Sequence, residues 1–337
     1  MTKGYKYRGG IGVFDKDGKS IFERDVNTIV NNQIYLPTKD GLNDPTEGFY
    51  NDDAIVTLLE KFKNYSAEVK KQYHRLLEKF ENVGVYSLSK KNDDELLWAY
   101  YASGHTGFAI EYDIDILKGS LNYNKYFQFV YDFDVDYVKS VPQADILVLQ
   151  GKDFNHILKT YLGTKSESWT HEREYRLIFD GEGLFDIDYR TVTGIYFGYR
   201  MQEKEIDFIM SKLRGRGLSY YKMELINNSY KFKPKKVDDK YADAIQYVDN
   251  CLDYNIDELL MPANLLGEKA YLYKDKLIDA LEIVRHEPLI KEIYIATVNV
   301  DSGEPLFIIW AYTKLGIPTS KEFNFKLDDK DELYRVK

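Results

Sequence analysis

The chain has 337 residues, which allows one large domain or two ordinary ones. Because 44% of the residues are apolar, there is enough apolar surface to offset the entropy of ordering, and this excludes an intrinsically disordered chain. The net charge of −9 disfavours a broad basic surface for nucleic acid, and the single cysteine, Cys251, excludes an internal disulfide and any multi-cysteine metal site.

The sequence also disfavours a membrane protein or a secreted one. It opens without an apolar leader, and no apolar run approaches the ~18 residues that a membrane span needs. We therefore expect a soluble protein of the cytoplasm.

Strand and helix patterns alternate over the first hundred residues. Extended segments are predicted at 5–8, 10–14 and 33–37, a short helix at 24–31, and a turn at 40–45, where turn-forming residues are dense. Apolar residues at helical spacing predict one or two helices over 52–80. A strand at 84–89 is followed by a helix that Asp93 caps and that runs through Tyr101.

The middle of the chain continues this mixture. Strands are predicted at 108–112, 127–138, 174–179, 194–197 and 219–225, and helices at 144–162 and 202–213. A sheet with flanking helices of the α+β class is therefore expected.

The composition changes near residue 235. Residues 1–234 carry 32 basic and 35 acidic side chains, whereas residues 235–337 carry 14 and 20. The second part reads as two helices, at 238–260 and 267–286, and two strands, at 293–300 and 305–312, joined by a hairpin turn at 301–304. We predict two domains, 1–234 and 235–337, the second a small αβ domain.

The most prominent motif brings aromatic side chains to the junction of a helix and a strand. Trp98, Tyr100, Tyr101 and His105 precede a glycine turn, and such junctions often carry function because the scaffold is rigid while the turn exposes side chains. The alternative is a core tryptophan with tyrosines packed around a turn.

A second motif places charged residues at alternating positions. If residue 172 already belongs to a strand, Glu172, Glu174 and Arg176 share one face. Two carboxylates beside a guanidinium suit electrostatic work on a cationic centre. The alternative is a solvated edge strand with an ion pair, which contributes little.

Three weaker signals remain. Tyr7 and Arg8 lie on the first strand, where a basic residue could hold a phosphate, and Asn43 lies in a turn that could bind a ligand. Asp132, Asp134 and Asp136 could bind magnesium together with Asp113, but alternating aspartates more often form the wet face of a strand. The histidines lack zinc spacing, so no metal site is predicted.

Five motifs in this order resemble a bacterial family, the domain of unknown function numbered 2971. The resemblance covers roughly residues 5–200. Its motifs here are Tyr5–Arg8, Asn43–Glu47, Ser87–Ser89, Leu97–Gly107 and Lys165–Arg176.

The order of these motifs also resembles the ADP-ribosyltransferase plan, which implies a split β-sheet core with flanking helices around NAD. By that resemblance Tyr7 or Arg8 holds the pyrophosphate or adenosine side. Tyr100, Tyr101 and His105 pack around or orient the nicotinamide. Glu172 or Glu174 binds the ribose hydroxyls and stabilises an oxocarbenium ion. The remaining residues assigned to NAD binding are Asn43, Trp98 and Arg176.

Three functional hypotheses follow. The leading one is an NAD-dependent ADP-ribosyltransferase, a glycosyltransferase acting as an intracellular toxin or antiviral defence effector on nucleic acid or protein. The second is a metal-dependent nuclease that uses Asp113, Asp132 or Asp134, and Glu172. The third is a non-catalytic protein that binds a nucleotide, with residues 235–337 binding an antitoxin or another partner protein.

Overall fold

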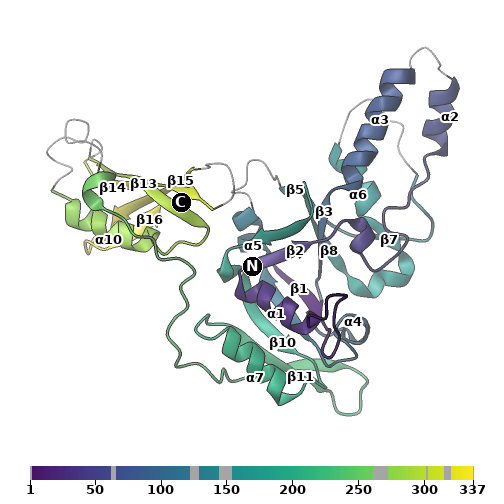
Figure 1. Cartoon of the computed structure of the whole chain (residues 1–337), viewed down its shortest axis with the longest axis horizontal. Helices are drawn as coiled ribbons and strands as arrows, with labels where there is room; N and C mark the ends of the chain where they lie inside the picture. Colours follow the sequence, from purple (N-terminus) through teal and green to yellow (C-terminus); the bar gives the residue numbers. More distant parts are fainter. Residues whose placement is uncertain are drawn as a thin grey trace.

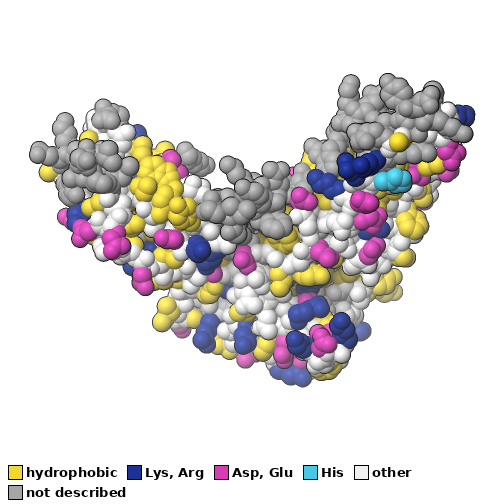
Figure 2. Space-filling model, turned by 45° about the horizontal axis from the view of Figure 1, so that its top comes forward, with side chains coloured by type: hydrophobic (Ala, Val, Ile, Leu, Met, Phe, Trp, Pro, Cys, Tyr) yellow, Lys and Arg dark blue, Asp and Glu magenta, His cyan; other side chains and the backbone are white. Residues whose placement is uncertain are grey.

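A computed structural model describes residues 2–61, 66–121, 129–143, 154–260, 272–300, 303–314 and 320–336. It confirms the α+β class: a large mixed sheet is accompanied by helices, and a smaller antiparallel sheet forms near the C-terminus (Figure 1). On the face seen in Figure 2, basic and acidic side chains are interspersed, and hydrophobic side chains gather on the C-terminal unit.

The large sheet has eight strands in the order β12-β11-β10-β4-β1-β3-β8-β5. All neighbours are antiparallel except β10 and β11, which are parallel. The strands are β1 (Lys3–Arg8), β3 (Gly84–Ser89), β4 (Phe108–Asp113), β5 (Phe129–Asp134), β8 (Glu174–Phe179), β10 (Val192–Phe197), β11 (Ser219–Leu225) and β12 (Phe232–Val237).

Strand pairing in the large sheet is least extensive at its centre, between β1 and β3. These strands are paired only at Tyr5 and Ser89. In contrast, β1 pairs with β4 over all six of its residues, and β3 pairs with β8 over all six of its own. The two halves of the sheet therefore separate beyond the Tyr5–Ser89 pair, and this gap positions the candidate site.

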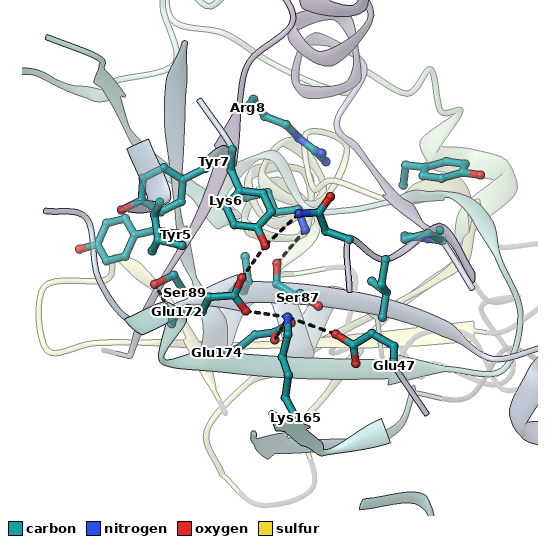
Figure 3. A pocket seen from close by; sticks show the side chains of 18 residues that line it. Tyr5, Lys6, Tyr7, Arg8, Glu47, Ser87, Ser89, Lys165, Glu172 and Glu174 are labelled. Carbon is teal, nitrogen blue, oxygen red and sulfur yellow. Dashed lines mark hydrogen bonds and ion pairs between the residues drawn. The ribbon is translucent and has the colours of Figure 1, made fainter. Parts of the chain in front are cut away.

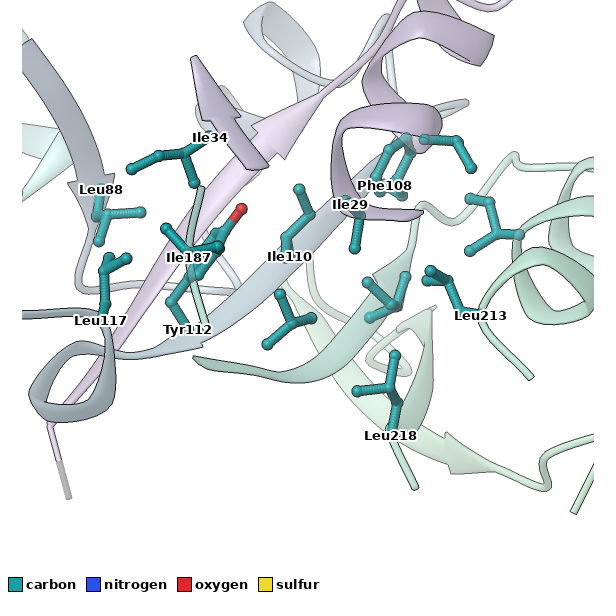
Figure 4. Packing of buried hydrophobic residues seen from close by; sticks show 14 of the residues in the cluster. Ile29, Ile34, Leu88, Phe108, Ile110, Tyr112, Leu117, Ile187, Leu213 and Leu218 are labelled. Carbon is teal, nitrogen blue, oxygen red and sulfur yellow. The ribbon is translucent and has the colours of Figure 1, made fainter. Parts of the chain in front are cut away.

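One face of the sheet is covered by α1 (Ile21–Val30), α5 (Ile114–Leu121) and α7 (Glu203–Lys212). Ser20 caps α1 by accepting a hydrogen bond from the Glu23 amide, and its apolar stripe, including Val26 and Ile29, is buried in the main core. Figure 4 shows Ile29 from this helix near Phe108 and Ile110 of β4.

This part of the chain also contains further helices and short strands. They are α2 (Asp53–Lys61), α3 (Ser66–Glu81), α4 (Glu95–Tyr100) and α6 (Phe154–Leu162), the 3₁₀ helices η1 (Lys39–Gly41), η3 (Glu167–Glu172) and η4 (Tyr189–Thr191), and two short strand pairs. Those pairs are β2 (Gln33–Leu36) with β9 (Gly183–Asp186), and β6 (Asp136–Val138) with β7 (Thr164–Ser166).

The C-terminal unit has its own hydrophobic core. Its sheet is an antiparallel meander of β13 (Ile290–Asn299), β14 (Leu306–Thr313), β15 (Ser320–Leu327) and β16 (Leu333–Val336), packed on α8 (Ile256–Leu259) and α10 (Lys274–Val284). The Glu287 carboxylate lies 2.9 Å from Arg335 within this unit and 3.2 Å from Arg190, which follows β9, so it forms an ion pair between the unit and the first part of the chain.

The predicted helix at 238–260 is wrong, since only α8 forms there. Tertiary contacts hold this segment instead: the Tyr247 amide donates to the Gly215 carbonyl, and the Arg216 guanidinium lies 3.9 Å from the centre of the Tyr247 ring. The predicted boundary at 235 falls inside β12, which pairs with β11 through Val237.

Several other boundaries also differ. Asp94, not Asp93, caps α4. Residues 10–13 form a turn closed by the Val13 amide, which donates to the Gly10 carbonyl, and Phe14 forms an isolated β-bridge with Ser20. The strand predicted over 127–138 is divided into β5, which pairs with β8, and β6, which pairs with β7, and residues 127 and 128 lie outside the described residues. The sequence patterns missed β15 and β16. Parts of the helices predicted at 144–162 and 267–286, and of the turn at 301–304, lie outside the described residues.

Candidate functional site

A cavity of about 360 Å³ lies at the gap between β1 and β3 (Figure 3). This volume is within the roughly 300–1,000 Å³ range of small-molecule sites. Its lining residues are Tyr5, Lys6, Tyr7, Arg8, Tyr35, Pro37, Gly41, Leu42, Asn43, Glu47, Ser87, Leu88, Ser89, Leu97, Tyr101, Lys165, Glu172 and Glu174.

Glu172 enters this cavity from the end of η3. The next residue, Arg173, has a left-handed backbone with φ of 43°, so the chain turns sharply between the 3₁₀ helix and β8. One Glu172 carboxylate oxygen accepts from the Tyr101 hydroxyl and the other from Lys165 Nζ at 2.7 Å. The expectation that residues 172, 174 and 176 share one strand face is therefore wrong for residue 172, which precedes the strand.

Glu172 belongs to a cluster of buried charged side chains. We define this buried charge cluster as Glu47, Lys165, Glu172, Glu174 and Arg176. The fully buried Arg176 guanidinium binds both oxygens of Glu47, at 2.7 and 2.8 Å, and both oxygens of Glu174, at 2.9 and 3.0 Å. Lys165 Nζ lies 3.2 Å from Glu47 and 3.7 Å from Glu174. Three carboxylates against two cations leave one net negative charge beside the cavity.

The cluster shifts the pKa values of Glu174 and Lys165, and Glu172 shifts that of its neighbour Tyr101. Burial alone would raise the pKa of Glu174, but Arg176 and Lys165 lower it to about 2. Burial opposes the charge on Lys165, yet Glu174, Glu47 and Glu172 together raise its pKa. Burial and Glu172 also raise the pKa of the Tyr101 hydroxyl, which therefore remains a hydrogen-bond donor.

The opposite wall is basic and comes from β1. Lys6 is half-buried, and its Nζ donates to the Ser87 carbonyl at 2.8 Å and lies 5.1 Å from the centre of the Tyr86 ring. Burial, and then the neighbouring Arg8, lower the pKa of Lys6 to about 7. The Arg8 guanidinium lies 3.8 Å from the Asp25 carboxylate.

Two tyrosines of β1 form a further side of the cavity. The Tyr5 hydroxyl donates to Glu111 at 3.1 Å, and burial and Glu111 raise the pKa of Tyr5 to about 12. The Tyr7 hydroxyl donates to the Lys91 carbonyl at 2.7 Å. Because both hydroxyls are engaged in the protein, these residues offer the cavity mainly their rings.

Most predicted site residues come together at this cavity. The predicted residues that line it are Tyr7, Arg8, Asn43, Tyr101, Glu172 and Glu174. Arg176 lies behind the cavity wall, where it binds Glu174 and Glu47. The sequence reasoning did not assign Lys6, Glu47, Ser87, Ser89 or Lys165 to the site. The signal that was available for the serines is the Ser-x-Ser pattern on β3.

Trp98, Tyr100 and His105 do not line this cavity. Trp98 is fully buried, its indole N–H donates to the Asn92 carbonyl, and its ring meets the Tyr7 ring edge-on at 5.1 Å. His105 packs against Trp98, whereas Tyr100 is 63% exposed. The packing interpretation of this motif fits Trp98 and His105, which support the cavity wall through Tyr7.

The glycine turn after His105 also supports β1. A side chain at Gly107 would place its Cβ 2.1 Å from the Arg8 carbonyl oxygen. We expect Gly107→Ala to lower the free energy of unfolding by about 1–3 kcal/mol, the usual cost of overpacking. Urea denaturation followed by circular dichroism measures it. Gly119→Ala in α5 is the control, because no atom lies within 4 Å of its added Cβ; equal midpoints for the two variants would contradict this role.

The carboxylates of the nuclease hypothesis do not meet. Asp113 caps α5 by accepting from the Asp115 and Ile116 amides, and Asp132 accepts from Lys118 at 2.7 Å. Among the described residues, no group of three or more His, Cys, Asp or Glu side chains is placed to hold a metal ion.

Comparison with known proteins supports the family prediction over part of the chain. Residues 97–177 match the model of a family described as protein of unknown function (DUF2971). The match begins in α4 and ends in β8, so it includes Tyr101, Lys165 and Glu172 but neither β1 nor β3. No curated protein and no solved structure matches the chain. In the described parts of the chain, no helix has the length and apolar character needed to cross a membrane.

Proposed function

We propose that the cavity binds NAD as a substrate and that the protein is an ADP-ribosyltransferase. The observation that carries this proposal is that three neighbouring strands contribute to one cavity: Arg8 from β1, Ser87 from β3, and Glu172 from the turn that starts β8. This arrangement is similar to the ADP-ribosyltransferase plan, in which a basic, histidine or tyrosine residue on the first strand, an aromatic or serine-bearing segment, and a glutamate on a late strand surround NAD. The likeness is one of motif placement.

The acidic side of the cavity supports the chemical step. Loss of nicotinamide from NAD leaves positive charge on the ribose, and preorganised negative charge lowers the energy of such a transition state. Glu172 supplies a carboxylate that Tyr101 and Lys165 hold in position. The net negative charge of the buried charge cluster acts in the same direction.

The basic side supports binding. Arg8 provides a guanidinium that can bind a pyrophosphate with two parallel hydrogen bonds. The Ser87 side-chain hydroxyl is buried next to Glu174 and makes no hydrogen bond of good geometry within the described residues, so it can turn toward a polar ligand group. Asn43 contributes an amide whose N–H₂ lies 3.4 Å from the Tyr101 hydroxyl. These residue types fit a dinucleotide.

The cellular setting is part of the proposal. An exposed free thiol at Cys251 fits a reducing compartment, which favours the cytoplasm. The acceptor would be a nucleic acid or a protein, as expected for an intracellular toxin or a defence effector. The C-terminal unit, with its separate core, is the part that could bind an antitoxin or another partner.

Release of nicotinamide tests the proposal. The full-length protein is incubated with NAD labelled either in the nicotinamide or in the adenine, with and without cell lysate. We expect free nicotinamide to accumulate, and the adenine label to enter a macromolecular fraction when lysate is present. Saturable NAD binding without any nicotinamide release would instead favour the non-catalytic nucleotide-binding hypothesis, and no binding would exclude both.

A further inference from the structure

The cavity contains many titratable groups, and most of them are bound to another charged or polar side chain. Arg176 occupies both oxygens of Glu47 and Glu174. Glu172 is bound by Tyr101 and Lys165 and is needed as an anion. The pKa values of Tyr5, Tyr7 and Tyr101 are raised. The Arg8 guanidinium lies 3.8 Å from the Asp25 carboxylate.

Lys6 differs from all of these groups in its surroundings. The residues of β1 alternate, so Lys6 lies on the opposite face of the strand from Tyr5 and Tyr7 but still reaches the cavity through the gap (Figure 3). The Ser87 carbonyl is the single hydrogen-bond partner that Lys6 Nζ has within the described residues. Within the described residues, no carboxylate lies within ion-pair distance of Lys6 Nζ, although Asp25 on α1 and Glu174 on β8 are near enough to act on its charge.

The charges around Lys6 come from three elements. They are Arg8 on its own strand, Asp25 on α1, and Glu174 and Arg176 on β8. Asp25 is already paired with Arg24 at 2.8 Å, and Glu174 with Arg176. The burial of Lys6 is therefore not compensated by a dedicated counter-ion, and its pKa falls to about 7.

We propose that Lys6, in its neutral form, is the base that takes the proton from the acceptor during ADP-ribosyl transfer. This inference rests on the proposed function. The three cations that line the cavity among the described residues differ in their partners: Arg8 lies 3.8 Å from Asp25 and Lys165 lies 2.7 Å from Glu172, whereas Lys6 Nζ has no carboxylate within ion-pair distance. A buried amine without a counter-ion gives up its proton readily, and this suits a base.

The proton balance of the step is simple. The bond between the ribose C1′ and the nicotinamide nitrogen breaks, and its electron pair leaves with nicotinamide, which becomes neutral. A lone pair of the acceptor forms the new bond to C1′, and the acceptor's proton moves to the Lys6 lone pair. Lys6 then returns this proton to solvent, so the overall reaction releases one proton.

This role narrows the class of acceptor. A carboxylate acceptor attacks without losing a proton and needs no base. An acceptor that attacks through a hydroxyl, an amide or a nucleobase N–H group must lose a proton when it bonds to C1′. The presence of Lys6 in the cavity therefore points to an acceptor whose nucleophilic atom carries a hydrogen, and water meets this requirement as a simple probe.

The test compares wild type, Lys6→Arg and Lys6→Met with NAD as the only added substrate and water as the acceptor. We expect the wild-type kcat to rise with pH between about 6 and 8, because Lys6 must be deprotonated to act. Lys6→Arg keeps the positive charge but cannot lose its proton, so it should bind NAD within about threefold of wild type while kcat falls by about 10²–10⁴-fold. Lys6→Met should lose kcat similarly and also lose the pH dependence. Lys233→Arg, at an exposed position of β12, is the control.

A second readout does not depend on turnover. At pH 7 an amine-acylating reagent should label Lys6 faster than the exposed lysines, since their amines remain protonated, and peptide mass spectrometry identifies the site. Turnover of Lys6→Arg with the wild-type rate and pH profile, or absence of selective labelling, would overturn the role of Lys6. Absence of NAD binding by wild type would instead overturn the proposed function itself.

Discussion

Replacing Glu172 by Gln is expected to reduce nicotinamide release from NAD by about 10²–10³-fold, the usual loss when one preorganised electrostatic group is removed. NAD affinity should change much less, because the amide keeps the size and one acceptor oxygen of the carboxylate. The measurement is kcat and Kd for NAD, obtained separately by steady-state kinetics and calorimetry.

The structure distinguishes Glu172 from Glu174, which the sequence left equivalent. Both oxygens of Glu174 are bound by Arg176, whereas Glu172 is held by the Tyr101 hydroxyl and the Lys165 ammonium. We assign the electrostatic role to Glu172 and a structural role to Glu174. Glu167→Gln, an exposed carboxylate on the same 3₁₀ helix, is the matched control and should keep wild-type activity. Equal activity of Glu172→Gln and Glu167→Gln would refute the assignment.

Replacing Arg176 by Met is expected to destabilise the protein by about 3–5 kcal/mol, the usual cost of breaking a buried ion pair by removing one partner. Arg176 is fully buried and donates to Glu47, Glu174 and the Leu162 carbonyl, so its loss leaves two buried carboxylates without their main partner. The free energy of unfolding is measured by urea denaturation.

The control for this variant is Arg214→Met, which changes the same residue type at an exposed position. Its effect should stay within about 0.5 kcal/mol, as for most surface substitutions. If Arg176→Met proved as stable as Arg214→Met, this result would contradict the role of the buried charge cluster in stabilising the cavity wall.

The same cluster should make the stability depend on acid. The pKa of Glu174 is lowered from an ordinary 4.5 to about 2 by Arg176 and Lys165, against the opposing effect of burial. Below pH 4.5 the unfolded chain binds a proton that the folded protein does not, so this contribution is lost as the pH falls from 4.5 to about 2. Urea midpoints measured across this range should fall less steeply in Arg176→Met than in wild type. Parallel pH profiles for the two proteins would contradict the pairing of Glu174 with Arg176.

Sequence patterns predicted strands of the large sheet better than the geometry of the site. The strands at 84–89, 174–179 and 219–225 were predicted with the observed bounds, because alternation and short apolar runs are local signals. The gap between β1 and β3 depends on how two distant strands pair, which no local pattern reports. Lys6 was therefore visible only as a basic residue of the first strand.

Glu172 and His105 show two further limits. Glu172 points into the cavity because Arg173, the next residue, has a left-handed backbone. Residues other than glycine seldom adopt this conformation, and nothing in the local sequence predicts it. His105 and Trp98 stand out as an aromatic motif, and only packing shows that they support Tyr7 from behind. The helix expected at 238–260 failed because contacts with Gly215 and Arg216 outweigh its local propensity.

The most direct test of the central claim is a crystal structure of Glu172→Gln grown with saturating NAD. The account predicts NAD in the gap between β1 and β3, with the nicotinamide ribose beside position 172 and the pyrophosphate at Arg8. An empty cavity at saturating NAD, or NAD bound anywhere else on the protein, would contradict it.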